Sequence, residues 1–361
     1  MRILTVNAGS SSLHLVYVDG GATGDRLDIS DPPESSGVLG IVDAFVADQK
    51  APDAVGYRLV HGGDEVRSAR VVDDLLRAHL DSVADLAPLH VPPALMLLDR
   101  LRQRLPGVPH VVCPDSAFHS SLPAAAATYP LPARWRSHWG LRRYGFHGLS
   151  YSWATRRAAQ LVGQDVAGLQ MVICHLGGGA SVCAVDGGRS VDTSMGFTPL
   201  DGLPMSSRSG AIDPGMLIWL LGGRLSLEEL AQGLYRESGL LGLSSGRSGD
   251  TRELVAAAPR DDAATLALEV YVHRVRREIA AAASSLSRLD ALVFTGEIGW
   301  DQPEVRLAVC LGLRQLGVPA PVRGNRNDDG PVSPAGAAVS VLVVEPREDL
   351  QIATDAAAAL P

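Results

Sequence analysis

With 361 residues, the chain is longer than a single hydrophobic core usually serves, so we expect two domains. Its 46% hydrophobic and 20% charged residues are typical of a folded globular protein. A formal charge of −8 argues against nucleic acid or an anionic membrane surface as the main partner. Lys50 is the only lysine, which excludes P-loop NTPases, protein kinases and Schiff-base enzymes, so any phosphate chemistry must rely on arginine, backbone amides and metal.

The first half of the chain alternates predicted strands and helices. Residues 2–7 and 13–18 are expected to pair as strands, and the polar, Gly- and Pro-containing segment 20–37 is expected to be a loop. The elements expected after it are helix 37–49, strand 54–61, helices 75–86 and 93–104, and strand 109–113. The last strand would deliver Asp115 to its carboxyl end, where α/β folds usually place their chemistry.

The second half is predicted to cross into another lobe at residues 142–150. The elements expected there are helix 151–162, a hairpin over 169–186, helices 214–221, 227–237 and 263–286, strand 289–295, helix 305–316, an apolar mixed segment 334–344 and helix 350–360. An α/β protein without a long linker is the result.

Two segments resemble each other, residues 6–21 and 174–188. Each is an apolar run, a turn rich in Gly or Ser, a second apolar run and then Asp-Gly-Gly. Such turns bring free backbone N–H groups close to a ligand and suit phosphate oxygens. The duplication therefore predicts two related lobes that hold a polyphosphate from both sides.

Four cysteines occur without Cys-x-x-Cys spacing: Cys113, Cys174, Cys183 and Cys310. We expect buried free thiols in a reducing cytosol rather than disulfides or a metal site. The chain starts directly in a strand-like run, and no apolar stretch reaches membrane-spanning length. These features predict a cytoplasmic protein.

An ordered set of short blocks resembles the acetate kinase (acetokinase) family over nearly the whole chain. The blocks are residues 7–12 (NAGSSS), 61–63 (HGG), 86–90 (LAPLH), 143–148 (RYGFHG), 175–177 (HLG), 192–208 (DTSMGFTPLDGLPMSSR) and 238–244 (SGLLGLS). The resemblance implies a two-lobed, actin-like fold shared with sugar kinases and Hsp70, of the RNase H-like type, with duplicated βββαβα domains. It implies an N-terminal lobe of residues 1–148 plus 348–361 on the carboxylate and phosphoryl side. It also implies a C-terminal lobe of residues 149–347 that binds nucleotide and forms a homodimer.

The activity that the resemblance implies is reversible, ATP-dependent phosphorylation of acetate to acetyl phosphate by direct in-line transfer. Such a transfer needs cations around the phosphoryl oxygens, and planar guanidinium groups can hold carboxylate and phosphoryl groups bidentately. The catalytic residues that the resemblance implies are Asp115, His147, His175 and Arg208. The substrate-binding residues are Arg58, Val60, Leu89, Phe146 and Pro199, with His90 expected to have a supporting role.

The implied cofactor is Mg²⁺ or Mn²⁺, with ATP as co-substrate. Carboxylates together with phosphate oxygens and water suit octahedral Mg²⁺, and the resemblance assigns Asn7 and Glu348 to the metal, with Asp349 as the alternative to Glu348. The nucleotide-binding residues that it implies are Ser12, His14, His175, Gly177, Gly178, Gly179, Asp250, Thr251, Arg252, Gly296, Glu297, Ile298 and Gly299.

The chain departs from the family pattern at several positions. The family normally has other residues at His14, Tyr57, Val91, Gly178, Glu297, Trp300 and Asp301. His14 and Gly178 each remove a side chain that could contact phosphate, and Glu297 adds charge beside the adenosine turn.

These departures leave two alternatives to acetate kinase. One is a kinase for propionate, butyrate or another small carboxylate, using ATP or a different phosphoryl donor. A methylene group is discriminated by only about 1–3 kcal/mol in an apolar pocket, so relaxed specificity is expected. The other alternative is a non-catalytic homologue that binds nucleotide or acyl phosphate.

Overall fold

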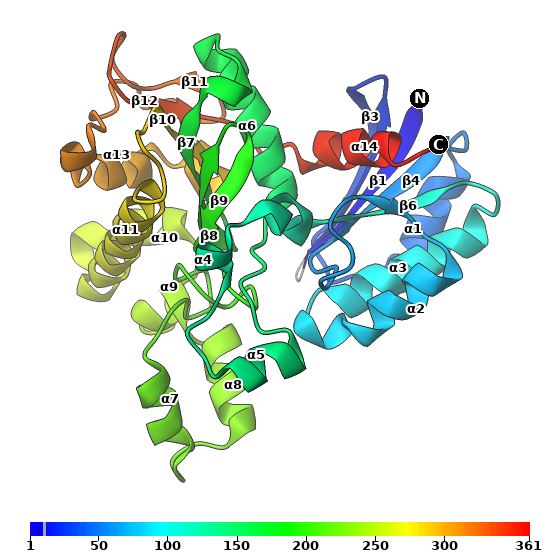
Figure 1. Cartoon of the computed structure of the whole chain (residues 1–361), viewed down its shortest axis with the longest axis horizontal. Coiled ribbons are helices and arrows are strands. Elements are labelled where there is room, and N and C mark those ends of the chain that lie inside the picture. Colours follow the sequence, from blue (N-terminus) through cyan, green and yellow to red (C-terminus); the bar gives the residue numbers. More distant parts are fainter. Residues whose placement is uncertain (10–11) are drawn as a thin grey trace. The chain divides into compact units, whose positions relative to one another are not determined.

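The computed structural model describes residues 1–9 and 12–361, and the chain divides into two compact units (Figure 1). The first unit contains Met1–Ser120, Phe146–Trp153 and Arg347–Pro361, and the second contains Ser121–Gly145 and Ala154–Pro346. Residues 121–145, expected with the N-terminal lobe, therefore pack with the second unit.

A six-stranded mixed sheet forms the centre of the first unit, in the order β3-β2-β1-β4-β6-β5. Its strands are β1 (Arg2–Ala8), β2 (Leu13–Asp19), β3 (Ala22–Ile29), β4 (Ala54–Leu59), β5 (Arg70–Val71) and β6 (His110–Pro114). The strands β1 and β2 pair antiparallel, whereas β4 runs parallel to both β1 and β6. The helices of this unit are α1 (Val38–Ala47), α2 (Asp74–Ser82), α3 (Val91–Arg104), the first part of α6 (Gly148–Val162) and α14 (Glu348–Ala358).

The C-terminal helix α14 covers one face of this sheet, along β1, β4 and β6 (Figure 1). Ile3, Val111 and Cys113 pack there against Ile352 and Ala356 of α14. Gly56 of β4 allows the close approach, because a Cβ at Gly56 would lie 2.7 Å from the Ile352 side chain. Since side chains alternate along a strand, the residues two further along from Gly56 and from Cys113, Arg58 and Asp115, lie on the same face as α14.

The second unit repeats this arrangement with the order β11-β12-β10-β7-β8-β9. Its strands are β7 (Gln170–Leu176), β8 (Ala180–Asp186), β9 (Arg189–Thr193), β10 (Ala291–Thr295), β11 (Gly330–Pro331) and β12 (Ser340–Val343). Three antiparallel strands, β9-β8-β7, continue into parallel β10 and β12, just as β3-β2-β1 continue into β4 and β6. The predicted duplicated, two-domain α/β fold is therefore confirmed.

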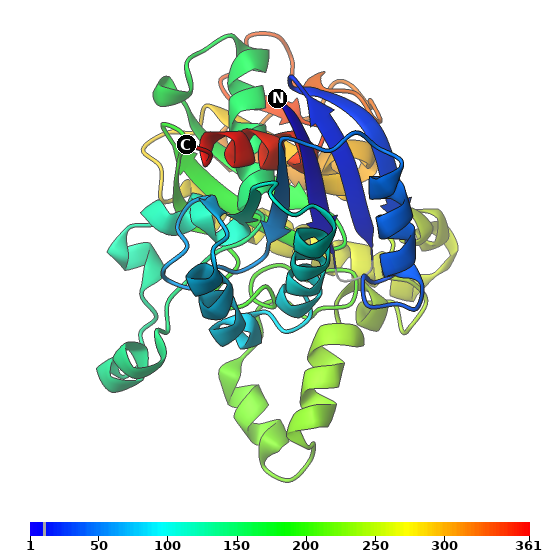
Figure 2. The same cartoon turned by 90° about the vertical axis from the view of Figure 1, so that its right-hand side faces the viewer.

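The remaining helices belong to the second unit. They are α4 (Ala124–Ala127), α5 (Ala133–Trp139), α7 (Pro214–Leu221), α8 (Leu227–Arg236), α9 (Gly239–Leu243), α10 (Thr251–Ala257), α11 (Asp262–Ala283), α12 (Gly296–Asp301) and α13 (Pro303–Leu311). Within this unit, α7 and α8 form a helical hairpin (Figure 2). In the part of the chain that the structure describes, no helix combines the length and apolar character that crossing a membrane requires.

The predicted loop over residues 20–37 is wrong for most of its first half. Residues Ala22–Ile29 form β3, which pairs with β2 and places His14 directly opposite Asp28. Most of the β3 side chains are exposed, so an edge strand of this kind lacks the alternation of apolar and polar residues that sequence analysis detects. The third strand of the second unit, β9, is also absent from the expected elements, because its sequence RSVDT contains only one apolar residue.

Candidate functional site

Three neighbouring strands of the first unit place polar side chains on one face of their sheet. Asn7 lies near the end of β1, Arg58 near the end of β4, and Asp115 directly after β6. These three strands are parallel, so their carboxyl ends meet at one edge, as expected for a ligand site of an α/β sheet. The amino terminus of α14 adds Glu348 to the same group.

Arg58 is the centre of this polar group. Its Nε and Nη2 donate to Oδ2 of Asp115 over 3.0 and 2.8 Å, and its Nη1 donates to Oδ1 of Asn7 over 3.1 Å. The same Nη1 lies 3.7 Å from Oε2 of Glu348. Burial alone would lower the pKa of Arg58, but the two carboxylates outweigh it and raise that pKa above its usual value. Arg58 is therefore a fixed cation.

Asp115 is completely buried at the amino terminus of α6. Its Oδ1 accepts a hydrogen bond from the Leu149 N–H over 3.5 Å, and the chain passes so close that a Cβ at Gly148 would lie 1.9 Å from the Asp115 carbonyl oxygen. Burial and the Glu348 carboxylate raise the pKa of Asp115, while Arg58 opposes that rise. The carboxylate is thus held rigidly between one arginine and a helix terminus.

Glu348 makes a hydrogen bond to the polar group around Arg58, whereas the neighbouring Asp349 bonds to Arg347 instead. Oε2 of Glu348 accepts from Nδ2 of Asn7 over 2.8 Å. Asp349 instead accepts two hydrogen bonds, of 3.1 and 3.0 Å, from Arg347. Between the two register alternatives, the geometry favours Glu348 as the residue that faces the site.

The donor set tests whether a metal fits here. Among the described residues, no cluster of three or more His, Cys, Asp or Glu side chains could hold an ion by itself. Asn7, Asp115 and Glu348 offer only oxygen ligands from side chains, and Mg²⁺ is commonly bound by one or two carboxylates together with phosphate oxygens and water. The group therefore fits Mg²⁺ delivered with a phosphate ligand, and does not fit a soft metal.

The predicted apolar substrate residues of this unit lie close to buried histidines. Val60 follows β4, and Phe146, which is 1% exposed, packs edge-to-face with the His61 ring at a centroid distance of 5.5 Å. His147 precedes α6 with a left-handed φ of 58°, a strained conformation for a residue other than glycine. Leu89 lies half-buried immediately before α3, followed by His90 at the amino terminus of that helix.

Two buried histidines to which the sequence assigns no role, His61 and His119, lie beside Phe146. Burial lowers the pKa of His61 to about 4, so this residue is neutral, and its Nδ1 accepts from the Gly63 N–H over 2.9 Å. His119 is also buried and makes a 2.9 Å hydrogen bond from Nε2 to the Phe146 carbonyl oxygen. Both side chains support the segment that carries Phe146 and His147. In the sequence, His61 ends one predicted strand and His119 follows another, and these positions do not predict their contacts with Phe146.

His14 occupies the first hairpin with a defined set of partners. Its Nδ1 lies 2.5 Å from Oδ1 of Asp28, and its Nε2 lies 3.2 Å from Oγ of Ser12. Arg26 in turn pairs with Asp28. The turn residues Ser10 and Ser11, part of the predicted phosphate-binding turn, lie outside the described residues.

The second hairpin places His175 one residue before the end of β7. Its turn is closed by a 2.9 Å hydrogen bond from the Gly177 N–H to the Gly179 carbonyl, and the Gly178 carbonyl accepts from the Ser206 N–H over 3.3 Å. The start of α12 lies beside this turn, since a Cβ at Gly177 would be 3.7 Å from the Glu297 nitrogen. Two of the predicted nucleotide-binding segments, 177–179 and 296–299, are thereby brought together.

Arg208 and Pro199 are also brought together within the second unit. Nη1 of Arg208 donates to the Pro199 carbonyl over 3.3 Å and lies 3.8 Å from Sδ of Met205. The Met205 N–H donates a hydrogen bond to the Arg208 carbonyl over 3.0 Å, so Arg208 lies in a short loop that is closed by this bond.

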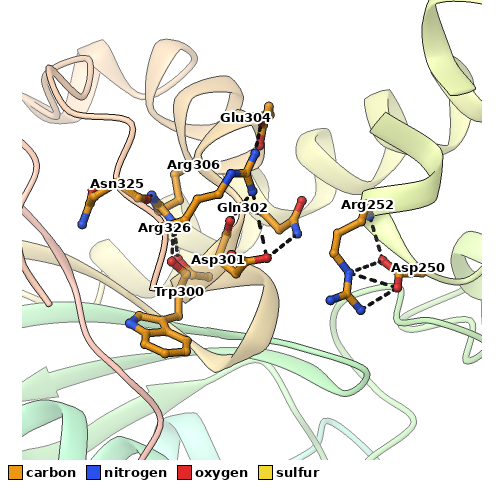
Figure 3. A network of polar contacts seen from close by, with 10 residues as sticks. Asp250, Arg252, Trp300, Asp301, Gln302, Glu304, Arg306, Asn325 and Arg326 are labelled. Atoms are coloured by element: carbon orange, nitrogen blue, oxygen red, sulfur yellow. Dashed lines mark hydrogen bonds and ion pairs between the residues drawn. The ribbon is translucent and has the colours of Figure 1, made fainter. Parts of the chain in front are cut away.

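Asp250, Thr251 and Arg252 form the start of α10 (Figure 3). Asp250 caps the helix through the Arg252 N–H over 2.7 Å, and the Arg252 side chain folds back onto the same carboxylate. The Asp250 carboxylate and the nearby Asp301 and Glu297 raise the pKa of the exposed Arg252. This predicted nucleotide pair is therefore an exposed ion pair, facing the acidic side of α12.

The sequence model of the acetokinase family matches residues 35–354 of the chain. The acetate kinase of Synechococcus sp. is 47% identical over 305 residues, covering 83% of this chain and 75% of that protein, and the acetate kinase of Thermotoga maritima is 37% identical over 98% of both.

Solved structures give the same answer. The Porphyromonas gingivalis acetate kinase matches with a TM-score of 0.88 and 31% identity over all of both chains. A Francisella tularensis propionate kinase matches with a TM-score of 0.90 and 30% identity, over 99% of this chain and all of that one. The ROK hexokinase of Thermus thermophilus, at 15% identity and a TM-score of 0.50, shares only the fold. With a family model that matches most of its length and relatives 37–47% identical to it, this chain belongs to the acetokinase family.

Proposed function

We propose that the chain catalyses reversible, ATP-dependent phosphorylation of acetate to acetyl phosphate. The observation that carries the proposal is the group of Asn7, Arg58, Asp115 and Glu348 at the carboxyl ends of three parallel strands, in a member of the acetokinase family. A carboxylate oxygen attacks the γ-phosphorus in line, the bond to the β,γ-bridging oxygen breaks, and ADP leaves.

Arg58 supplies the fixed positive charge for the acyl side of this reaction. Its bonds to Asp115 and Asn7 restrain the guanidinium, so a bound carboxylate or acyl phosphate meets a cation that does not reorganise. Asp115 is a positioning carboxylate in this assignment, because its Oδ2 is already occupied by Arg58. Val60, Phe146 and Leu89 are assigned to the acyl group, together with Pro199.

We assign to Arg208, His175 and His147 the role of stabilising the negative charge that develops on the phosphoryl group during transfer. Arg208 is mounted on a short loop, and His175 stands at the end of a buried strand, so both are held by backbone structure rather than by long flexible segments. Such preorganised donors contribute most where charge grows during transfer.

Mg²⁺, or Mn²⁺, is the proposed metal, held through Glu348 and Asn7 and brought in with ATP. When bound, it neutralises the phosphate oxygens of the nucleotide. The nucleotide itself is assigned to Ser12 and His14 of the first unit. In the second unit it is assigned to the turn 177–179, residues 250–252 and the first residues of α12.

Propionate is the second candidate substrate, because a structural relative of high similarity is named a propionate kinase. Phe146 and Val60 are both buried, so the acyl pocket assigned to them is apolar and would accept an additional methylene group with a modest free-energy difference. We propose acetate as the preferred acid and propionate as a slower one.

A homodimer is part of the proposal, and α7 supports it. This helix is apolar throughout (PGMLIWLL), yet none of its residues is buried, and Ile218 and Trp219 are 75% and 58% exposed. An exposed apolar patch of this kind is expected to be covered by a partner. Sedimentation of the wild type and of Ile218→Glu tests it, and a dimer that persists in the variant would contradict an interface at α7.

A cytosolic location completes the proposal. The four cysteines are free and buried, which suits a reducing compartment.

The experiment that tests the function is hydroxylamine trapping of acyl phosphate from purified protein, Mg²⁺ and ATP. Acetate, propionate and butyrate are compared, with GTP and pyrophosphate as alternative donors. Product with acetate supports the proposal. A folded protein that binds Mg-ATP but forms no product with any acid or donor would instead be a binding homologue.

A further inference from the structure

Arg306 of α13 is a completely buried arginine, with 1% of its surface exposed. Its guanidinium donates to three backbone carbonyls, from Nη1 to Gly299 over 2.9 Å and Trp300 over 2.8 Å, and from Nη2 to Asn325 (Figure 3). Among the described residues, no carboxylate forms an ion pair with it. Burying a cation in this way costs free energy, and an apolar side chain would fill the same space without that cost.

The charge nevertheless remains. Burial and the neighbouring Arg326 lower the pKa of Arg306 to about 10, which leaves the guanidinium protonated at neutral pH. The planar guanidinium carries several N–H donors and binds two separate segments at once, which an apolar side chain cannot do. Those segments are the end of α12 and the loop 324–329.

The helix α12 depends on such support. It has only six residues, so it is too short to be stable by itself, and its last carbonyls need partners. Its start is pressed against β7, because a Cβ at Gly296 would lie 2.5 Å from the Leu176 carbonyl oxygen. Gly296 accordingly has a left-handed φ of 77°. The start of α12 packs against β7, and the carbonyls of Gly299 and Trp300 near its end are bound by Arg306.

The loop that Arg306 binds is itself anchored. Asp329 accepts a 2.9 Å hydrogen bond from Arg157 and another from the Glu345 N–H, while Arg326 donates to the Asp301 carbonyl and pairs with Glu304 (Figure 3). The loop is therefore a rigid support rather than a passive neighbour. A change at Arg306 would remove the bonds that join the Gly299 and Trp300 carbonyls to this loop, and would leave the bond from Arg326 to the Asp301 carbonyl.

We propose that Arg306 is a positioning residue for nucleotide binding, which holds the turn 296–299 in register with the hairpin turn 177–179 by tying the end of α12 to the loop 324–329. This inference rests on the proposed function, because it assigns the turn 296–299 to the nucleotide. It makes Arg306 a determinant of nucleotide affinity without contact to the nucleotide.

The test compares Arg306→Lys with Arg276→Lys in the full-length protein. Lysine keeps the charge but cannot reach all three carbonyls. Arg276 is the matched control, because it is a partly buried arginine that binds the carbonyls of Ala308 and Val309 at the other end of α13. Arg306→Met, which removes the charge and all donors, serves as a stronger variant if it folds.

Two measurements are made on each protein. The first is the dissociation constant for Mg-ADP, alongside KM values for ATP and acetate. We expect Arg306→Lys to weaken Mg-ADP binding by about tenfold or more, equivalent to about 1.4 kcal/mol, and to leave the acetate KM within about twofold. Arg276→Lys should change neither. The second is hydrogen exchange of residues 296–301 and 324–329 without nucleotide, which should accelerate only in the Arg306 variants.

Equal Mg-ADP affinities for Arg306→Lys and the wild type would overturn the proposal, as would unchanged exchange at α12. A loss of thermal stability shared equally by both lysine variants, with no selective effect on nucleotide, would mean that Arg306 is only structural. If the wild type itself binds no nucleotide, the proposed function fails, and the exchange data alone then decide whether Arg306 holds α12.

Discussion

Asn7 and Glu348 lie 341 positions apart in the sequence and are joined by a 2.8 Å hydrogen bond between Nδ2 and Oε2. The contact exists because α14 returns to the sheet that β1 began and packs along β1, β4 and β6. Arg58 completes the group by donating to Asn7 on one side and to Asp115 on the other. One end of the chain thus supplies a residue to a site built by the other.

Replacing Glu348 tests the role of this contact. Glu348→Gln removes the charge proposed for the metal, so we expect turnover to fall by about a hundredfold and the Mg²⁺ requirement to rise. Initial rates at increasing Mg²⁺ measure both. Asp349→Asn is the matched control, since Asp349 pairs with Arg347 instead. Equal losses in the two variants would refute the assignment of Glu348 rather than Asp349.

The two arginines that are proposed to face the substrate, Arg58 and Arg208, are tested by replacement with alanine. Arg58→Ala leaves the buried carboxylate of Asp115 without its cation, which is expected to cost about 3–5 kcal/mol of folding free energy. Arg208→Ala is the companion variant, at an arginine whose Nη1 donates to the Pro199 carbonyl. Both variants should lose activity by about a hundredfold or more.

Urea titration and acyl phosphate trapping separate these effects. Normal stability of the Arg58→Ala protein would contradict a stabilising role of the ion pair between Arg58 and Asp115. Near-normal turnover in either variant would show that the replaced arginine has no role in the reaction.

His14 is expected to weaken nucleotide binding relative to a lysine. His14→Lys adds a charge that is permanent at neutral pH beside the first hairpin turn, so the nucleotide dissociation constant should fall about threefold to tenfold. His14→Gln retains hydrogen bonding to Ser12 and Asp28 without a charge and serves as the control. Calorimetry at two salt concentrations measures the effect, and a lysine variant with unchanged or weaker affinity would disprove the idea.

Two buried histidines should make the protein sensitive to acid. Burial lowers the pKa of both His61 and His110 to about 4, whereas an unfolded histidine titrates near its ordinary value. A depressed folded pKa means that the unfolded state binds more protons below about pH 6.5, so folding stability is lost as the pH falls from there towards 4.

Each of these histidines should contribute a slope of up to about 1.4 kcal/mol per pH unit over that range. Denaturation at pH 7 and at pH 5 measures how the free energy of unfolding depends on pH. His110→Gln should reduce the number of protons taken up on unfolding by about one. His110 also accepts a hydrogen bond from the Tyr57 hydroxyl over 2.7 Å, so the variant is expected to be less stable at pH 7 as well. A slope unchanged by the substitution would contradict the assignment to His110.

The Tyr57–His110 contact also resolves one departure from the family pattern. Tyr57 stands next to Arg58 in the sequence, but the alternation of β4 turns it to the opposite face of the sheet, where it stacks on His110 at 5.7 Å. A substitution adjacent to a site residue in sequence therefore lies outside the site.

The sequence alone determined the class of fold and the family. The repeated apolar run, turn and Asp-Gly-Gly are local features, and hairpins are specified by residues that are close in the chain, so both hairpins could be predicted. The position of Asp115 directly after β6 could be predicted for the same reason. The edge strands β3 and β9 could not be predicted, because neither of their sequences, ATGDRLDI and RSVDT, alternates regularly between apolar and polar residues.

Only the tertiary structure decided which residues distant in the sequence are in contact. The choice of Glu348 over Asp349 depends on the rotation of α14 about its axis as it packs on β4, which no local pattern encodes. The burial of Arg306 depends in the same way on a loop almost twenty residues further along that closes over it. Local sequence specifies elements through short-range sterics and hydrogen bonds, whereas packing of one element on another fixes the neighbours of each side chain.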